Sequence, residues 1–171
     1  KQVRKLRKRI ERYRNDDRRR LYVERELKDL YLKLVWSTIF HIVKVVRDIR
    51  QEDGWKMIAL GSDYDGLVDP INAFPEVDSF QDLRQEMVHY LNAGEEIYFL
   101  QNGETKPFPF SEVRALQQGQ SAEQLLDRIL GGNTQAFLAK YFTESYLTED
   151  VPDMTFTEPN TTNLVSRRAT A

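Results

Sequence analysis

Cysteine is absent from this sequence of 171 residues, and histidine occurs only at His41 and His89. The lack of cysteine excludes disulfide bonds and metal sites built on thiolates. Proline and glycine are sparse, with 6 and 8 residues, which is typical of a globular protein and not of a low-complexity chain. The most apolar stretch, residues 34–46, is interrupted by polar side chains and is shorter than the roughly 20 apolar residues that span a bilayer. We therefore expect no transmembrane helix.

Net charge is small but unevenly placed. The whole chain carries −2, whereas the first twenty residues carry +8 and the remainder carries −10. A basic run can mark an arm that binds nucleic acid or a membrane surface. Only Tyr13 and Tyr22 are interleaved with it, which favours a solvated helix face, so neither nucleic acid nor a membrane surface is the expected partner. The basic residues are Lys1, Arg4, Lys5, Arg7, Lys8, Arg9, Arg12, Arg14, Arg18, Arg19 and Arg20.

Helical periodicity dominates the first fifty residues. Residues 1–14 repeat apolar side chains at helical spacing, and a second pattern runs from about 21 to 49. Ser37 and Thr38 interrupt the good helix formers, so the second pattern predicts either one helix or two. His41 lies on its apolar face, and we expect both His41 and His89 to be packed core histidines, not metal ligands.

The middle of the chain carries the predicted strands. Gly54 is predicted to be a left-handed cap that ends the preceding helix. Residues 56–60 are a short apolar run bounded by turn residues, a pattern typical of a buried parallel strand. A helix is predicted over 79–92, followed by a hairpin in which the strand at 97–100 turns at Asn102-Gly103.

The C-terminal part is predicted to be helical and then loosely ordered. Helices are expected over 110–118 and 121–130, with Ser121 as a cap, and Gly131-Gly132 is predicted to end the second one before another begins at Asn133. From residue 148 the chain is rich in Thr, Pro, Asp and Asn, which predicts a loosely held tail. Five aromatic residues are expected in the core: Phe108, Phe110, Phe137, Tyr141 and Phe142.

The clearest candidate for a functional site follows directly after the predicted strand, in the run Gly-Ser-Asp-Tyr-Asp-Gly at residues 61–66. In βα-barrels, polar residues at the carboxyl end of a strand face the active site. Asp63 and Asp65 stand at that position. The alternative is that these aspartates cap backbone amides in a turn, where Asp is common.

The run at 61–66 resembles the end of the eighth strand in the membrane (renal) dipeptidase family of the amidohydrolase superfamily. His41-Ile42 resembles part of the helix before that strand, although Phe40 replaces an Asp. Residues 129–133, Ile-Leu-Gly-Gly-Asn, followed by Phe137, resemble the closing helices. The similarity covers roughly residues 37–142. It implies a predominantly α chain with a short buried strand, forming the C-terminal part of a (β/α)8 (TIM) barrel.

The resemblance also implies a function, that of a zinc-dependent dipeptidase with two zinc ions. Asp63 would move the proton between the metal-bridging hydroxide and the leaving amine, while Tyr64, Asp65 and Gly66 would line the mouth or shape the loop. The family's zinc ligands lie on earlier strands and include a His-x-Asp pair that this chain lacks. We therefore expect no metal ligand in this chain and no activity from it alone, with the remainder of the barrel as its partner and a dipeptide as the parent enzyme's substrate.

Three segments follow from this interpretation. Residues 1–50 would be a basic helical segment leading into the last barrel strand, 51–147 the strand, active-site loop and closing helices, and 148–171 the tail. The chain begins with Lys1 and not Met, which favours a fragment, and the apolar surface left uncovered would allow a homodimer. The alternative function is a helical interaction module that binds an acidic partner, nucleic acid or a membrane surface through residues 1–20.

Overall fold

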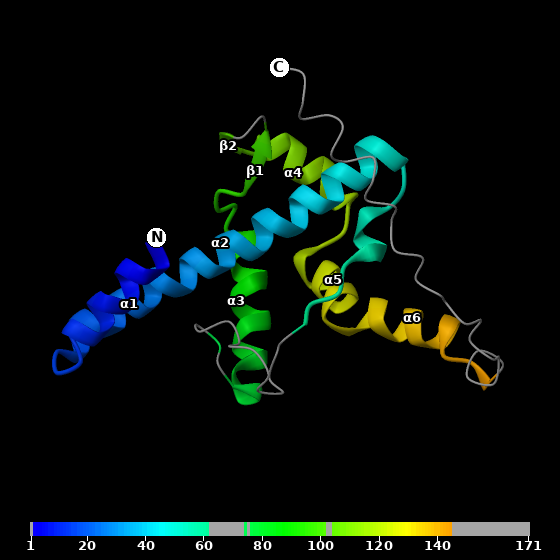
Figure 1. Ribbon diagram of the computed structural model, residues 1–171. Helices are drawn as coiled ribbons and strands as arrows, with labels where there is room; N and C mark the ends of the chain where they lie inside the picture. Colours follow the sequence, from blue (N-terminus) through cyan, green and yellow to red (C-terminus); the bar gives the residue numbers. More distant parts are fainter. Residues whose placement is uncertain (1, 62–73, 75, 102–103, 145–171) are drawn as a thin grey trace, which may run out of the picture. The chain divides into compact units, whose positions relative to one another are not determined.

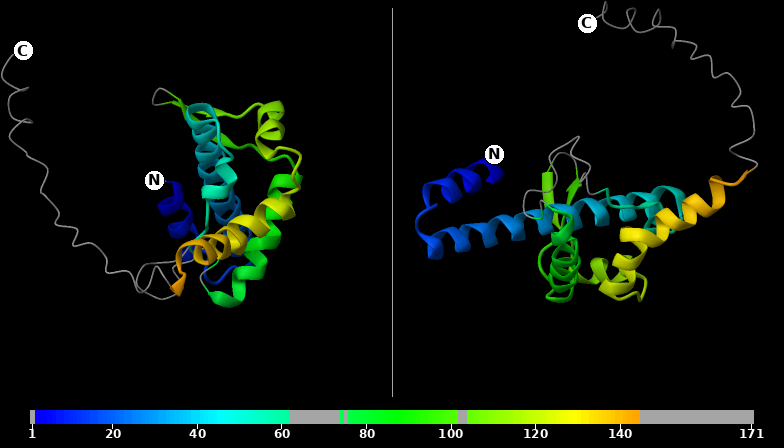
Figure 2. Two further views of the ribbon diagram at one scale, coloured as in Figure 1. Left: turned by 90° about the vertical axis from the view of Figure 1, so that its right-hand side faces the viewer. Right: turned by 90° about the horizontal axis from the view of Figure 1, so that it is seen from below.

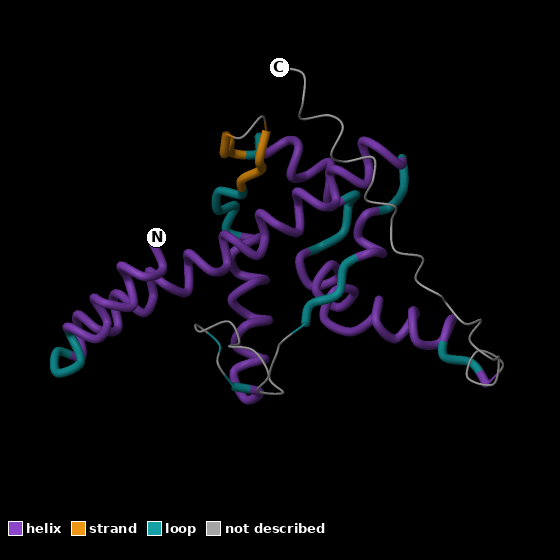
Figure 3. Tube along the Cα trace, viewed as in Figure 1, coloured by secondary structure: helices purple, strands orange, loops and turns teal. Residues whose placement is uncertain are grey.

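The computed structural model describes residues 2–61, 74, 76–101 and 104–144. The chain divides into two compact units, residues 1–137 and 138–171. Figure 1 labels the helices and the strands, and Figure 3 shows how helices dominate the described part. The elements are α1 (Gln2–Arg12), α2 (Asp17–Arg50), η1 (Gly54–Met57), η2 (Val77–Ser79), α3 (Phe80–Asn92), β1 (Tyr98–Gln101), β2 (Glu104–Pro107), α4 (Phe110–Gln117), α5 (Ala122–Asp127), η3 (Arg128–Gly132) and α6 (Asn133–Tyr141).

The second helical pattern forms one continuous helix of 34 residues, α2. Asp16 begins it as the N-cap, because its Oδ1 accepts a hydrogen bond from the Arg19 amide at 3.2 Å. Gln51 ends it in the left-handed conformation, with φ 56°. The prediction that Gly54 is the left-handed cap is therefore wrong. Glycine is needed at position 54 for a different reason, since a Cβ there would lie 2.8 Å from the Val43 Cα of α2.

Helix α1 packs against the N-terminal half of α2 (Figure 2). The two helices share a small core of their own, in which Leu6 from α1 meets Val23 and Leu27 from α2. Val3, Ile10, Tyr13, Leu30 and Tyr31 surround it. The apolar residues of α1 at helical spacing are thus all turned toward α2.

The main core lies along the C-terminal half of α2, against α3, α4 and α5. Trp36, Phe40 and Val43 are fully buried there, and the indole nitrogen of Trp36 donates to the Met87 carbonyl at 3.1 Å. Phe40 packs edge-on against Trp55, with ring centroids 5.4 Å apart. These contacts join parts of the chain that are far apart in sequence into one apolar interior.

The predicted hairpin is present, whereas the predicted strand before the active-site run is not. β1 and β2 pair antiparallel, from Tyr98 opposite Pro107 to Gln101 opposite Glu104; the turn at 102–103 lies outside the described residues. At 56–60 the expectation was wrong, because η1 ends at Met57 and the following residues pair with no described strand. The described residues are therefore predominantly α with a small antiparallel sheet, and the barrel stays an expectation.

The helix break expected at Gly131-Gly132 is also wrong. α5 leads into a π-helical turn, η3, and then into α6. Asn133 adopts right-handed helical dihedrals and does not cap a new helix. At the start of α5 the prediction is confirmed, because Ser121 and Gln124 form a capping box with bonds of 2.9 and 3.3 Å. The tail predicted from residue 148 lies outside the described residues.

Two further expectations about burial need correction. Among the five aromatic residues expected in the core, Phe108 is buried, but Phe110 is 61% exposed and the other three are exposed as well. His41 is half-buried on α2, whereas His89 is exposed on α3 and is not a core residue. No helix among the described residues is long and apolar enough to cross a membrane.

Candidate functional site

The run at 61–66 begins where the described structure stops. Gly61 is exposed, and a Cβ added there would meet nothing within 4 Å. Asp63, Tyr64, Asp65 and Gly66, which carry the sequence-based site assignment, lie outside the described residues. What the structure defines is the segment that leads into the run, residues 53–60, and how it is held.

Asn133 holds this segment from α6. Its side-chain Nδ2 donates to the carbonyl of Trp55 at 2.6 Å and to the carbonyl of Ile58 at 2.7 Å. An amide nitrogen carries two hydrogens, so one asparagine can satisfy both carbonyls. These two bonds satisfy the carbonyls of Trp55 and Ile58, which have no described strand beside them.

The π-helical turn makes a third bond to the segment. The Asn133 amide bonds to the carbonyl of Arg128, five residues back, and not to that of Ile129. The Ile129 carbonyl accepts a hydrogen bond from the Leu60 amide at 2.9 Å. A regular α-helix would direct the Asn133 amide to the Ile129 carbonyl, so the wider turn releases the acceptor that holds Leu60.

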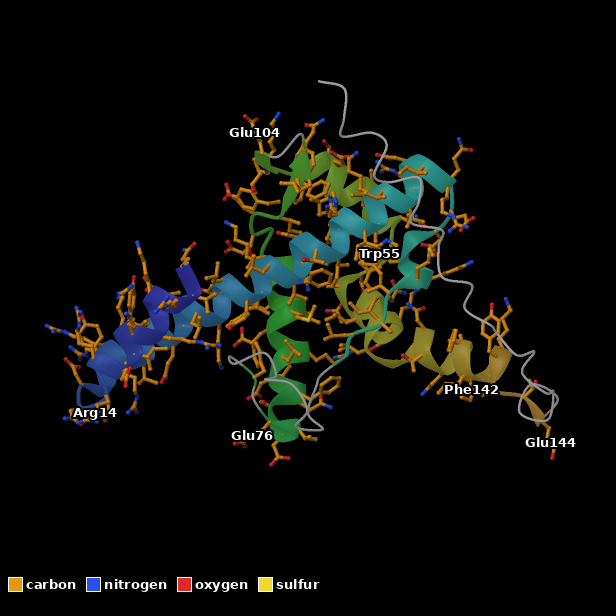
Figure 4. The ribbon with its side chains drawn as sticks, in the orientation of Figure 1. Arg14, Trp55, Glu76, Glu104, Phe142 and Glu144 are labelled. Carbon is orange, nitrogen blue, oxygen red and sulfur yellow. The ribbon has the colours of Figure 1, made fainter. Side chains whose placement is uncertain are left out.

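Two further contacts fix the start of the segment. Asp53 accepts from the Trp55 amide at 3.1 Å and forms an ion pair with Arg128 at 2.8 Å. The Trp55 indole, labelled in Figure 4, is fully buried and donates to the Leu116 carbonyl at 2.7 Å. α2, α4 and the helices after Ser121 therefore all contact residues 53–60. The segment that leads into the 61–66 run is therefore held by contacts with several helices.

The segment that leads into the 61–66 run therefore meets the Ile-Leu-Gly-Gly-Asn stretch at 129–133 in the structure. About seventy residues separate them in sequence, yet three hydrogen bonds join them. The prediction that Asn133 is a helix cap did not include this role, which depends on contacts between residues far apart in sequence.

The perturbed ionisable groups of the described residues lie elsewhere. Lys44 of α2 contacts Glu112 of α4 at 2.7 Å and Asp48 at 2.9 Å. Hydrogen bonds to Glu112 and then to Asp48 raise the pKa of Lys44, and the bonds from Lys44 and Arg47 lower the pKa of Asp48. Burial raises the pKa of Tyr90, whose hydroxyl donates to the Glu96 carbonyl at 3.0 Å. These groups join neighbouring elements and are structural.

The described residues do not supply a zinc site. No group of three or more His, Asp or Glu side chains within this part of the chain could hold a metal ion. His41 lies on α2 with its Nδ1 buried and without a hydrogen-bond partner among the described residues, and His89 lies on α3. The two histidines therefore stand on different helices.

The described residues also form two concave regions. A groove of about 1010 Å³ is lined by α1, α2 and α3 residues of both charge signs, and a second of about 540 Å³ lies around Phe110 and Arg114. Neither groove is lined by residues 53–61.

No family model, curated protein or solved structure matches the chain.

Proposed function

We propose that this chain is the C-terminal part of a zinc-dependent dipeptidase of the membrane dipeptidase type, built on a (β/α)8 barrel. The observation that carries the proposal is the junction between residues 55–60 and 129–133. Residues 129–133 resemble this family in sequence, and residues 55–60 lead directly into the 61–66 run, which resembles it as well. Their direct bonding supports a shared structural role at the base of the 61–66 run.

The second supporting observation is the uncovered apolar surface of α2. One face of its C-terminal half is buried in the main core, including Trp36 and Phe40. The opposite face continues the stripe on which α1 packs, but there it is exposed. A helix that is apolar on both faces normally has a covering layer on each, which supports a further part of the protein packing here. The residues of this uncovered stripe are Leu34 (49% exposed), Ile42 (39%), Val45 (39%) and Ile49 (76%).

In this proposal Asp63 is the proton-transfer residue. A carboxylate at the mouth of the site takes a proton from the attacking water and returns it to the leaving amine. Tyr64, Asp65 and Gly66 shape the loop around it. Zinc is assigned to ligands from other segments of the parent enzyme, because the described residues of this chain do not fit it.

Turnover of a dipeptide by the full-length parent tests the catalytic assignment. We expect Asp63→Asn to lower kcat by about 10²- to 10⁴-fold while the zinc content stays near that of the wild type. Asp78→Asn is the matched control, since Asp78 is exposed and precedes α3. Full activity of Asp63→Asn, or equal losses in both variants, would remove Asp63 from the mechanism.

The uncovered stripe gives an independent test. We expect Ile42→Lys to destabilise the full-length parent strongly but to leave the isolated chain nearly unchanged. Leu100→Lys, at a position 58% exposed on β1, should be nearly neutral in both. Two outcomes would show that the remainder of the barrel does not cover the stripe. One is that Ile42→Lys leaves the stability of the parent unchanged as well. The other is that the isolated chain is a dimer and that Ile42→Lys makes it monomeric.

A further inference from the structure

The outward face of α1 is almost entirely basic. Because Val3, Leu6 and Ile10 are turned toward α2, the exposed positions of α1 are left to polar side chains. Only one acidic residue, Glu11, occurs in this helix. The described basic residues that are exposed on it are Arg4, Lys5, Arg7, Lys8 and Arg12.

Most of these cations have no partner within the described residues. Several other positive charges of α1 and α2 are compensated: Arg9 pairs with Glu26 at 2.7 Å, Arg19 pairs with Asp16, and Arg20 pairs with Asp17 and Glu24. Arg7 donates to the Tyr31 hydroxyl at 3.4 Å. The four that form no ion pair or hydrogen bond with a described residue, here called the cationic face, are Arg4, Lys5, Lys8 and Arg12.

The cationic face has a defined geometry because α1 is packed on α2 and is not a free arm. With a rise of ~1.5 Å and a rotation of ~100° per residue, its four cations extend over ~12 Å along the helix and ~100° around it. Arg4, Lys8 and Arg12 follow one another at intervals of ~6 Å. Figure 4 labels Arg14 in the turn between α1 and α2, where its side chain adds a further charge.

We propose that the cationic face binds the phosphate backbone of double-stranded DNA without reading its base sequence. A helix of ~10–12 Å diameter fits a major groove ~12 Å wide, whose two walls are lined by phosphates. Cations spread over ~100° of the helix surface face the groove, and their long side chains extend to its phosphates. A flat membrane is the weaker match, because a helix lying on lipid buries an apolar face, and α1 has its apolar face against α2.

Fluorescence anisotropy with a labelled duplex of about 20 base pairs, titrated at several NaCl concentrations, tests this inference. The logarithm of the binding constant should fall with the logarithm of salt with a slope of about −0.9 per phosphate contact, and hence about −3.6 for four contacts. In Arg4→Gln/Lys8→Gln/Arg12→Gln three contacts are lost, and the slope should fall to about −1. Glutamine keeps the helix propensity of these positions.

The matched control is Lys56→Gln/Lys106→Gln/Arg114→Gln, which removes the same charge from exposed positions outside α1. This control should keep the wild-type slope, and circular dichroism should show that both triple variants are folded. Equal losses of slope in the two variants would mean that net charge and not the cationic face binds DNA. Binding to phosphatidylserine vesicles without binding to the duplex would assign the face to membranes and overturn the inference. The proposal that the cationic face binds DNA does not depend on the dipeptidase assignment.

Discussion

Removing the Asn133 side chain should loosen the segment that enters the 61–66 run. In Asn133→Ala the carbonyls of Trp55 and Ile58 lose a donor at 2.6 and 2.7 Å. A carbonyl left unsatisfied in the interior costs about 1–3 kcal/mol. Both bonds are only partly buried, so water recovers some of this, and we expect a loss of about 2–4 kcal/mol. Domains are commonly stable by about 5–15 kcal/mol, so the change is large.

Equilibrium unfolding in guanidinium chloride measures this loss. Trp36 and Trp55 are both fully buried, so their fluorescence follows the main core as it opens. Asn92→Ala is the control, because Asn92 donates a single exposed bond of 3.4 Å to Glu123. Its free energy of unfolding should change by no more than about 0.5 kcal/mol.

The charged variant sharpens the test. Asn133→Asp keeps the shape but places an acceptor against two carbonyls, so the introduced carboxyl fits only when it is protonated. Its pKa in the folded state is therefore raised above the unfolded value of about 3.9. Stability relative to the wild type should be lowest near neutral pH and recover as the pH falls. If Asn133→Ala shifted the unfolding midpoint no more than Asn92→Ala, the two bonds would not hold the segment.

Two further predictions concern contacts of α2. Gly54→Ala should lower the free energy of unfolding by about 1–3 kcal/mol, since its Cβ would lie 2.8 Å from the Val43 backbone. The control Gly131→Ala should not destabilise the chain, because a Cβ there meets nothing within 4 Å. Equal thermal midpoints for the two variants would contradict this prediction. Lys44→Met should lower the thermal midpoint most between about pH 4 and 10. The lowered pKa of Asp48 means that its contribution is lost as the pH falls, and the raised pKa of Lys44 means that its contribution is lost at high pH; a pH-independent difference would contradict the assignment.

Local sequence determined the helices well, because their signals act over a few residues. α1, α3, α4 and α5 begin within about two residues of the positions predicted from apolar spacing and caps. The hairpin followed from an apolar run and an Asn-Gly turn signal. Helical periodicity also identified the face of α1 that packs, since Val3, Leu6 and Ile10 could only share a side in a helix.

Contacts between residues distant in sequence explain why the strand predicted at 56–60 and the helix stop predicted at Gly131-Gly132 were wrong. Residues 56–60 look like a strand by composition, but a strand is defined by a partner, and here the Asn133 side chain and the Ile129 carbonyl take that place. Gly131-Gly132 looks like a helix stop, yet packing carries the chain through as a π turn.

The functional inferences also rest partly on local sequence and partly on tertiary contacts. The sequence alone nominated Asp63, Tyr64, Asp65 and Gly66, because a short motif is local and readable, and these residues lie outside the described structure. Only the tertiary structure showed that the entry to this run is bonded to residues 129–133, that α2 is apolar on two faces, and that four cations of α1 have no ion-pair or hydrogen-bond partner among the described residues. Each of these depends on which side chains meet across the fold, and chain order does not specify that.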